Sequence, residues 1–327
     1  MQEDRLFSVI ITAYNIEEYI VTAINSVLGQ TYSAFEIIVV DDGSSDATVV
    51  RAQTVLCEQN NVQVITQENK GPGGARNTGI LAATGDYIVF LDGDDWLLET
   101  ALNLFKQQVE SMPDAVFSNK GWFYDKDKSY TSDLVFTKST QGSVSAGREL
   151  LRRYAVPAKA FKRDFLLSNK ILFPEGMAWE DYPFSYKVLA KANSINVITD
   201  ETYIARKRYS ENKSLTQKKR LGEFFLNSRF QQIDMDINIV NNSKLPVIFK
   251  GLNINNMEFE TRLMADIMYL VDEPDKQVSI RSMLMIKDYI SDKKLLIFDN
   301  VSEPVKYIYQ AILDENMLEI IKGIKQL

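Results

Sequence analysis

The chain has 327 residues, more than one hydrophobic core usually holds, so we expect a large catalytic domain with an appended region. Hydrophobic residues make up 45% and charged residues 25% of the sequence, which is typical of globular proteins and excludes bulk disorder. The net charge of −7 argues against general nucleic-acid binding, because that function needs a basic surface.

The sequence contains no histidine, the commonest general base and nitrogen ligand in enzymes. Acid–base chemistry must therefore use carboxylates, lysine, tyrosine or the single cysteine, Cys57. A bound metal would be a hard cation with oxygen ligands, such as Mg²⁺ or Mn²⁺. One cysteine forms no internal disulfide, and the apolar run at residues 7–11 is too short for a signal peptide. We therefore expect a cytoplasmic protein in which Cys57 is buried in a helix.

Short apolar runs alternate with amphipathic stretches over the first hundred residues. Strands are predicted at residues 7–12, 35–40, 62–66 and 87–91, and helices at residues 19–28, 48–58 and 74–83. This alternation predicts a mostly parallel α/β sheet. Such sheets bind ligands beyond the carboxyl ends of their strands, and all four runs end in polar or glycine-rich residues.

The first two strand ends suit a nucleoside. The first consists of Thr12, Ala13, Tyr14 and Asn15, and the second begins with Asp41 and Asp42. Tyr14 can stack on a planar base, although an isolated tyrosine more often serves packing. Asp42 can accept a ring N–H of a pyrimidine or a ribose hydroxyl. The alternative for the second segment is a strand-to-helix turn capped by Ser45 or Asp46.

The third strand end is a glycine-rich loop, residues 69–77, that opens a helix and contains Lys70, Gly73 and Arg76. Such loops suit phosphate groups. The spacing matches neither GxGxxG nor the P-loop, which disfavours ordinary dinucleotide-binding and kinase folds. A plain turn, in which the glycines only permit the bend, is the alternative.

The fourth strand end concentrates carboxylates in the segment Asp92, Gly93, Asp94 and Asp95. Clustered carboxylates repel each other unless a positive charge neutralises them, and a divalent ion accepts their oxygens directly. Gly93 would let a ligand approach the backbone closely. Alternatively, Asp94 and Asp95 cap a helix that begins at Trp96.

The pattern changes beyond residue 96. Helices are predicted at residues 97–112 and 148–154, strands at 115–124 and 195–199, and a polar, turn-rich stretch at 125–145. A basic segment, residues 203–216, follows the last strand, and the chain is mainly helical from about residue 219. Residues such as Val305, Ile308 and Ile312 recur at helical spacing and predict core packing, with a subunit interface, an acceptor-binding module or membrane-surface contact as alternatives.

The motifs TAYN, VVDDGSSD, NKGPGGARNTG and YIVFLDGDDW occur in the order seen in family 2 glycosyltransferases, and the chain resembles that family. The resemblance is close over residues 6–100 and looser to about residue 216. It implies the α/β GT-A fold, a Rossmann-like fold of nucleotide-diphospho-sugar transferases, at residues 1–218, with a mainly helical region at residues 219–327. It also implies inverting transfer from a UDP-sugar.

The resemblance further implies roles for individual residues. Tyr14 and Asp42 would contact the uracil, Asp92 the ribose and Asp94 the metal, Mn²⁺ or Mg²⁺, with Arg76 near the nucleotide. We expect the remaining strand-end residues to complete the donor site. They are Thr12, Ala13, Asn15, Asp41, Lys70, Gly73 and Gly93.

Inverting members of the family need a carboxylate base, and residues 176–184 resemble the family's Glu-Asp element. By this resemblance Asp181 is the general base, Glu180 supports it through contacts with sugar or acceptor hydroxyls, and Trp179 lines the sugar pocket. The same segment reads as a helix start with Asp181 as N-cap and Pro183 in the first turn, and both interpretations can hold together.

The basic segment resembles the family's late Arg and Ser-Leu-Thr element. Arg206, Arg208 and Ser214 are its candidates for stabilising the departing diphosphate. A solvated, charged strand edge is the alternative interpretation.

The leading hypothesis is a metal-dependent glycosyltransferase that extends or decorates a bacterial surface glycan, with a saccharide or polyol-phosphate acceptor. The helical region would serve acceptor binding, homo-oligomer formation or peripheral membrane contact. Two alternatives stay open. One is a nucleotidyltransferase, which would release pyrophosphate, and the other is a non-catalytic subunit that binds nucleotide-sugars or glycans.

Overall fold

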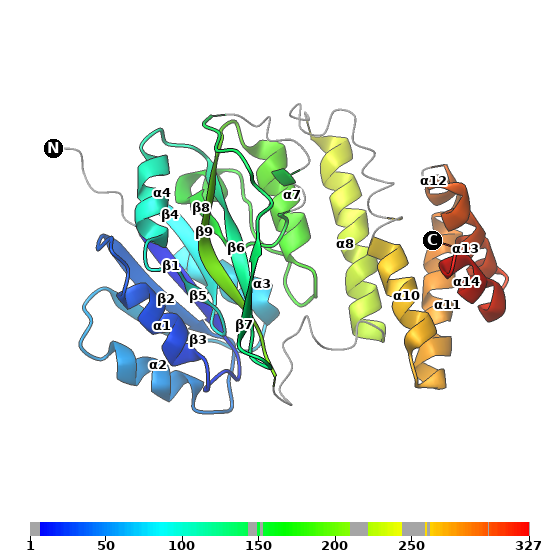
Figure 1. Ribbon diagram of the computed structural model, residues 1–327, viewed down its shortest axis with the longest axis horizontal. Coiled ribbons are helices and arrows are strands. Elements are labelled where there is room, and N and C mark those ends of the chain that lie inside the picture. Colours follow the sequence, from blue (N-terminus) through cyan, green and yellow to red (C-terminus); the bar gives the residue numbers. More distant parts are fainter. Residues whose placement is uncertain are drawn as a thin grey trace. The chain divides into compact units, whose positions relative to one another are not determined.

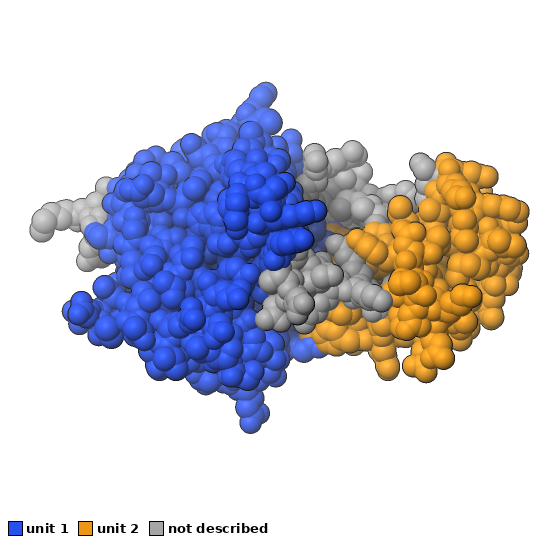
Figure 2. All heavy atoms as spheres, turned by 60° about the horizontal axis from the view of Figure 1, so that its bottom comes forward, with its two compact units in different colours: residues 1–176, 180–212, 244–248 blue, residues 177–179, 213–243, 249–327 orange. Residues whose placement is uncertain are grey.

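The structure is a computed structural model that describes residues 7–142, 149–150, 153–209, 222–243, 259, 262–299 and 301–326. The chain forms two compact units (Figure 2). Unit 1 comprises residues 1–176, 180–212 and 244–248, and unit 2 comprises residues 177–179, 213–243 and 249–327. The division of the chain at residue 218 into a catalytic domain and a helical region stays a prediction.

The first half of unit 1 is a parallel sheet, as the alternating pattern predicts. Its strands are β1 (Phe7–Ala13), β2 (Phe35–Asp41), β3 (Val62–Thr66) and β4 (Tyr87–Asp92), in the spatial order β3-β2-β1-β4. The connecting helices are α1 (Ile20–Leu28), α2 (Thr48–Leu56) and α3 (Gly71–Ala82). Helices α1 and α2 lie on one face of the sheet and α3 on the other (Figure 1), which explains why β1, β2 and β4 are apolar on both faces.

The second half of the sheet is mixed. The order continues from β4 through β8 (Lys159–Lys162), β6 (Ala115–Tyr124), β9 (Ile195–Lys207) and β5 (Trp96–Leu97), and β7 (Ser129–Asp133) pairs with β6. Strand β8 is antiparallel to both β4 and β6, whereas β6 and β9 are parallel. The expectation of a mostly parallel sheet therefore holds only for the first four strands.

Several local predictions are corrected. The helix expected from residue 97 begins at Ala101 as α4 (Ala101–Val109), because Trp96 and Leu97 pair with β9 as strand β5. The stretch 125–145 contains strand β7, whose polar residues are exposed at the sheet edge. Strand β9 continues eight residues beyond its predicted end at residue 199, to Lys207. Cys57 is exposed, because it lies at the C-cap of α2 rather than on the buried face of that helix.

Two more helices complete the described part of unit 1, α6 (Arg163–Ser168) and α7 (Asp181–Lys191). Phe184 of α7 packs edge-on against Phe90 of β4 and Phe161 of β8, with ring centroids 6.1 Å and 5.4 Å apart. These aromatic contacts hold the start of α7 against the sheet. Of the helix predicted at residues 148–154, residues 149 and 150 are helical and residues 153 and 154 are not, while residues 148, 151 and 152 lie outside the described residues.

Unit 2 is helical over its described residues. Its helices are α8 (Glu223–Asn242), α10 (Met264–Asp272), α11 (Lys276–Asp292), α12 (Lys294–Phe298), α13 (Glu303–Leu313) and α14 (Met317–Ile324). Val305, Ile308 and Ile312 are buried in its core, which confirms the prediction of core packing. Over the ranges that the structure describes, no helix is both long enough and apolar enough to cross a membrane.

Candidate active site

The register of the parallel strands gathers the predicted strand ends at one edge. Thr12 lies opposite Val40 and Asp92, and Ala13 lies opposite Asp41. The backbone N–H of Asp42 donates to the Ala13 carbonyl at 2.8 Å, and that of Gly93 donates to the Thr12 carbonyl at 2.9 Å. A side chain at Gly93 would come within 2.8 Å of the Thr12 carbonyl oxygen. Glycine is therefore required here for the close approach of two strand ends.

The residues predicted to bind the nucleoside differ in solvent exposure and in how far their side chains are already hydrogen-bonded. The ring of Tyr14 is 50% exposed. Asp42 is buried, and its Oδ1 accepts from Gln67 Nε2 at 2.8 Å and from the Lys70 N–H at 2.9 Å. Asp41 is also buried, and its Oδ2 accepts from the Ser44 N–H at 3.1 Å. Their nucleoside roles stay predictions.

Asn15 joins the first two strand-end loops. Its backbone has a left-handed φ of 49°, its N–H donates to Ser44 Oγ at 2.9 Å, and its Oδ1 accepts from the Ser45 N–H at 2.8 Å. The N-cap of α2 is Ala47, so the prediction of Ser45 or Asp46 at that position is wrong, although Asp46 Oδ1 accepts from the Thr48 N–H at 3.0 Å.

The glycine-rich loop is held against the segment that precedes α7. A Cβ at Gly73 would lie 2.4 Å from the Pro174 carbonyl oxygen and 3.2 Å from Phe173 Cβ, so only glycine fits. The structure thus provides a packing reason for Gly73, and its part in phosphate binding stays a prediction. The N-terminus of α3 is bound to the second strand end through Lys70 and Asp42.

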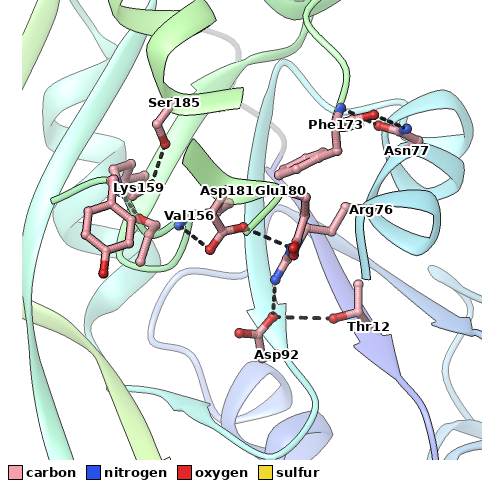
Figure 3. A network of polar contacts seen from close by, with 12 residues as sticks. Thr12, Arg76, Asn77, Asp92, Val156, Lys159, Phe173, Glu180, Asp181 and Ser185 are labelled. Atoms are coloured by element: carbon pink, nitrogen blue, oxygen red, sulfur yellow. Dashed lines mark hydrogen bonds and ion pairs between the residues drawn. The ribbon is translucent and has the colours of Figure 1, made fainter. Parts of the chain in front are cut away.

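Arg76 of α3 is the centre of the site, where it contacts three carboxylates (Figure 3). Its Nη2 lies 2.9 Å from Asp92 Oδ1, and its Nη1 lies 2.6 Å from Glu180 Oε1 and 3.0 Å from Asp181 Oδ1. Arg76 is buried, and its guanidinium also lies over the Phe173 ring, 5.3 Å from the centroid. The end of β4 and the start of α7 are therefore joined by one planar cation, which suits this geometry better than lysine.

The three carboxylates outnumber their cation, and this changes their protonation. Burial and the neighbouring Asp181 raise the pKa of Glu180 to about 7, although Arg76 opposes the rise. Burial also raises the pKa of Asp181, with Arg76 again opposing and Asp92 adding to the rise. Burial alone would lower the pKa of Arg76, but attraction by Asp181, Asp92 and Glu180 raises it well above its usual value. Such shifted, interacting carboxylates are typical of functional sites.

The second oxygen of Asp181 faces away from Arg76. Its Oδ2 accepts from the Val156 N–H at 3.4 Å, so the carboxylate lies between Arg76 and the segment before β8 (Figure 3). The helix start predicted here is confirmed, since α7 begins at Asp181 with Pro183 in its first turn. No side chain caps this helix at Glu180, because both carboxylates bind Arg76 instead. The predicted N-cap role of Asp181 is therefore wrong.

Strand β9 covers the rest of the acidic cluster. Asp95 Oδ1 accepts from the Arg206 N–H at 2.7 Å, and its Oδ2 accepts from the Tyr203 hydroxyl at 2.6 Å. The Tyr203 oxygen also accepts from the Asp92 N–H at 3.2 Å. The helix-capping alternative for Asp94 and Asp95 is wrong, because a strand follows them and Asp95 instead fastens that strand to β9.

Both candidate arginines of the basic segment contact the cluster. Arg208 Nη2 lies 2.6 Å from Asp94 Oδ2, and Arg206 Nε donates to the Asp94 carbonyl at 2.9 Å. Arg206 also pairs with Asp125 at 2.8 Å and lies over the Trp96 ring at 4.9 Å. The side chains of both arginines are at most 14% exposed, so the solvated strand edge considered above is wrong for them. Ser214 lies outside the described residues.

Asp94 is the residue predicted to hold a metal ion. Among the described residues, no three or more acidic or cysteine side chains form a group that could hold a metal by themselves. One carboxylate still fits Mg²⁺ or Mn²⁺, because such ions commonly take one or two protein carboxylates and complete their shell with phosphate oxygens and water. Burial raises the pKa of Asp94, Arg208 opposes the rise, and Asp92 adds to it. Burial and Asp92 thus disfavour the charged form of Asp94, and a bound metal ion would stabilise that form.

Trp179 belongs to unit 2, where the Arg229 guanidinium lies over its ring, 4.1 Å from the centroid. Its backbone has a left-handed φ of 67°, and the preceding Ala178 N–H donates to Ser228 Oγ at 3.1 Å. Its predicted place in a sugar pocket stays a prediction.

Sequence reasoning missed Tyr203, Val156 and Lys159. Tyr203 is fully buried beneath Asp92 and Asp95, and Lys159 is a fully buried lysine on β8. Burial along β9 does not alternate, so no period of the sequence could have indicated Tyr203. Val156 acts through its backbone, which no residue type reveals.

Comparison with known proteins agrees with this geometry. The family model described as Glycosyl transferase family 2 matches residues 8–169. Glycosyltransferase GlyG of Streptococcus pneumoniae serotype 4 is 32% identical over 217 residues, which are 62% of this chain and 71% of GlyG. Poly(ribitol-phosphate) beta-N-acetylglucosaminyltransferase TarS of Staphylococcus aureus is 30% identical over 213 residues, which are 64% of this chain but only 37% of TarS.

Solved structures show the same fold at lower identity. A crystal structure of S. aureus TarS in complex with UDP-GlcNAc has a TM-score of 0.74 at 22% identity, covering 96% of this chain and 88% of that chain. The mannosyltransferase PcManGT from Pyrobaculum calidifontis, in complex with GDP-Man and Mn²⁺, has a TM-score of 0.55 at 15% identity. The match covers 99% of this chain and 87% of that chain. The GT-A fold, with a helical C-terminal region, is thereby confirmed.

Proposed function

Because the chain belongs to glycosyltransferase family 2, we propose that it transfers a sugar from a UDP-sugar to a hydroxyl group of a bacterial surface glycan, with inversion at the anomeric carbon. The observation that carries this proposal is the Arg76 network, in which one guanidinium binds both Asp181, whose side chain is 20% exposed, and the strand-end residue Asp92. The complex of TarS with UDP-GlcNAc supports the choice of donor, and the name of TarS supports a polyol-phosphate glycan as acceptor.

In this mechanism Asp181 is the general base. Its carboxylate takes the proton of the acceptor hydroxyl as that oxygen attacks the anomeric carbon, and the bond from that carbon to the diphosphate breaks with its electron pair leaving on UDP. Arg76 positions Asp181 and Asp92 relative to each other, because one guanidinium binds both. Glu180, whose pKa is raised to about 7, is protonated in part at neutral pH and can donate to a sugar or acceptor hydroxyl.

The diphosphate is assigned to the cluster under β9. Asp94 would hold Mn²⁺ or Mg²⁺, and such an ion neutralises charge on the diphosphate. Arg208 and Arg206, which contact Asp94, supply two further positive charges there. Tyr14 and Asp42 are assigned to the uracil, and Asp92 to the ribose.

The test is a donor panel. Purified protein is incubated with UDP-sugars and Mn²⁺ or Mg²⁺, and released nucleotide is identified with and without acceptor glycans. Release of UDP in a metal-dependent manner is expected. Release of pyrophosphate would indicate nucleotidyl transfer instead, and full turnover in excess chelator would refute the role of Asp94.

A further inference from the structure

Lys120 of β6 is a buried lysine without a counter-ion among the residues that the structure describes. In the sheet the residue pairs with Asp133 on β7 and with Tyr203 on β9, and it is only 7% exposed. Its Nζ lies 4.3 Å from the centroid of the Trp122 ring. Within the ranges that the structure describes, this ammonium group forms no ion pair and no hydrogen bond. A buried charge that lacks a partner is costly, so its retention calls for a reason outside the fold.

The nearby carboxylates do not supply the missing partner, because each is already bound by another donor. The pairs are Asp133 with Arg153 at 2.7 Å, Asp92 with Arg76 at 2.9 Å, and Asp95 with the Tyr203 hydroxyl at 2.6 Å. Burial lowers the pKa of Lys120, and repulsion by Arg153 lowers it further. Asp95, Asp133 and Asp92 oppose this fall from a distance, but none of them forms an ion pair with Lys120 among the described residues.

Two more cations share this region. Lys159 of β8 is fully buried, donates to the Ala155 carbonyl and lies over the Phe117 ring at 4.8 Å. Burial lowers the pKa of Lys159 well below its usual value, and Arg153 and Lys120 both repel it. We call Lys120, Arg153 and Lys159 the cation cluster. They come from β6, from the segment before β8 and from β8 itself.

The cation cluster lies near the proposed base, by the carboxylate oxygen of Asp181 that does not bind Arg76. Asp181 binds Arg76 through one oxygen and the Val156 N–H through the other (Figure 3). Val156 belongs to the same segment before β8 as Arg153. Asp181 is also the carboxylate that attracts Lys159. The diphosphate, by contrast, is assigned to Asp94, which has its own arginines. Asp133, which pairs with Arg153 of the cluster, has a side chain that is 34% exposed, so solvent reaches this neighbour of the cluster.

We propose that Lys120, supported by Arg153 and Lys159, binds an anionic group of the acceptor, so that the accepting hydroxyl belongs to a phosphate- or carboxylate-bearing glycan. The inference rests on the proposed function only in taking Asp181 as the base. The anion would supply the counter-charge that Lys120 lacks, and it would fix the acceptor with its hydroxyl toward Asp181. Neutral saccharides offer no such partner and would bind less tightly.

Calorimetric binding to the full chain, saturated with UDP and Mn²⁺, tests this directly. The probes are ribitol 5-phosphate against ribitol, and glucuronate against glucose. We expect one charged probe to bind at least about tenfold more tightly than its neutral counterpart, because a charge-assisted contact to a buried cation has roughly that worth. The favoured pair identifies phosphate or carboxylate as the anion.

The variant Lys120→Met should abolish that preference, and Lys120→Arg should retain most of it. Lys187→Met is the matched control, because it removes a partly buried lysine of α7 that binds only the Leu172 carbonyl, at 3.2 Å, among the described residues. It should keep the preference. We expect Lys120→Met to melt at the same or a higher temperature than the parent protein, since it removes an uncompensated charge. A lower melting temperature with unchanged binding would show a purely structural role.

Two other results would overturn the inference. One is equal binding of charged and neutral probes by the parent protein. The other is a loss of donor hydrolysis in Lys120→Met when acceptor is absent, which would place Lys120 on the donor. Absence of UDP release from every donor would refute the proposed function, whereas the binding preference would still decide whether the anion site exists.

Discussion

Two buried ion pairs described in unit 2 are matched one to one, whereas the charges around Arg76 and Lys120 in unit 1 are not. In unit 2, Arg229 lies 2.7 Å from Asp266, and Arg262 lies 2.9 Å from Asp236, so each buried acid meets a cation of its own. In unit 1, Arg76 serves three carboxylates, and the ammonium of Lys120 meets none within the described ranges. Matched charges need no ligand to complete them. The comparison indicates that an unequal number of buried acids and cations, rather than burial alone, distinguishes a candidate ligand site from a structural ion-pair network.

The largest expected effect is that of removing the base. Asp181→Asn should lower kcat for transfer by about a thousandfold, because general-base catalysis is typically worth that much, while UDP binding stays nearly unchanged. The measurement is kcat for transfer beside a UDP titration. Asp272→Asn, an exposed position at the end of α10, is the control and should retain full activity. Normal turnover by Asp181→Asn would remove Asp181 from the mechanism.

A matched pair in unit 2 should respond in stability instead. Arg262→Met removes a cation from the fully buried Asp236, and we expect the free energy of unfolding to fall by about 3 kcal/mol. Chemical denaturation measures this loss, and kcat of the folded variant should equal that of the parent. A selective fall in kcat at unchanged stability would place this pair in the site and break the comparison.

Arg76→Lys tests whether the shared cation acts through geometry. Lysine keeps the positive charge but cannot bind three carboxylates with a planar fork, so kcat should fall by about a hundredfold through misplacement of the base. The unfolding free energy should change far less than the rate. Equal kcat values for Arg76→Lys and the parent would show that charge alone suffices.

The smallest effect concerns pH. The pKa of Glu180 is raised in the folded state from 4.5 to about 7, so its contribution to stability is complete below pH 4.5 and is lost as the pH rises through about 7. Glu180→Gln should therefore be more stable than the parent at pH 8, by on the order of 2 kcal/mol, and equally stable at pH 4.5. Denaturation at both pH values decides the matter. If the free energies of unfolding of Glu180→Gln and the parent differ by the same amount at both pH values, Glu180 does not have the raised pKa that its burial predicts.

The sheet edge was predictable because local pattern and topology agree there. The apolar runs of β1, β2 and β4 each end in polar residues. Parallel pairing brings those ends together at one edge, regardless of the conformation of the loops between the strands. Thr12, Asp41 and Asp92 could thus be assigned to one edge from sequence. The second half of the sheet could not, because β8 enters antiparallel between β4 and β6 through a pairing that no local period indicates.

By itself, the sequence determined the fold class and the acidic character of the predicted site, and the absence of histidine limited the candidates for a base to carboxylates, lysine, tyrosine and Cys57. Only the tertiary structure decided how the acids share their cations. Arg76 and Glu180 are 104 residues apart, and Lys120 lies beside β7 and β9 through strand pairing alone. Charge balance depends on distances between side chains from separate elements and on the exclusion of water around them. Neither quantity is contained in a local pattern of residues.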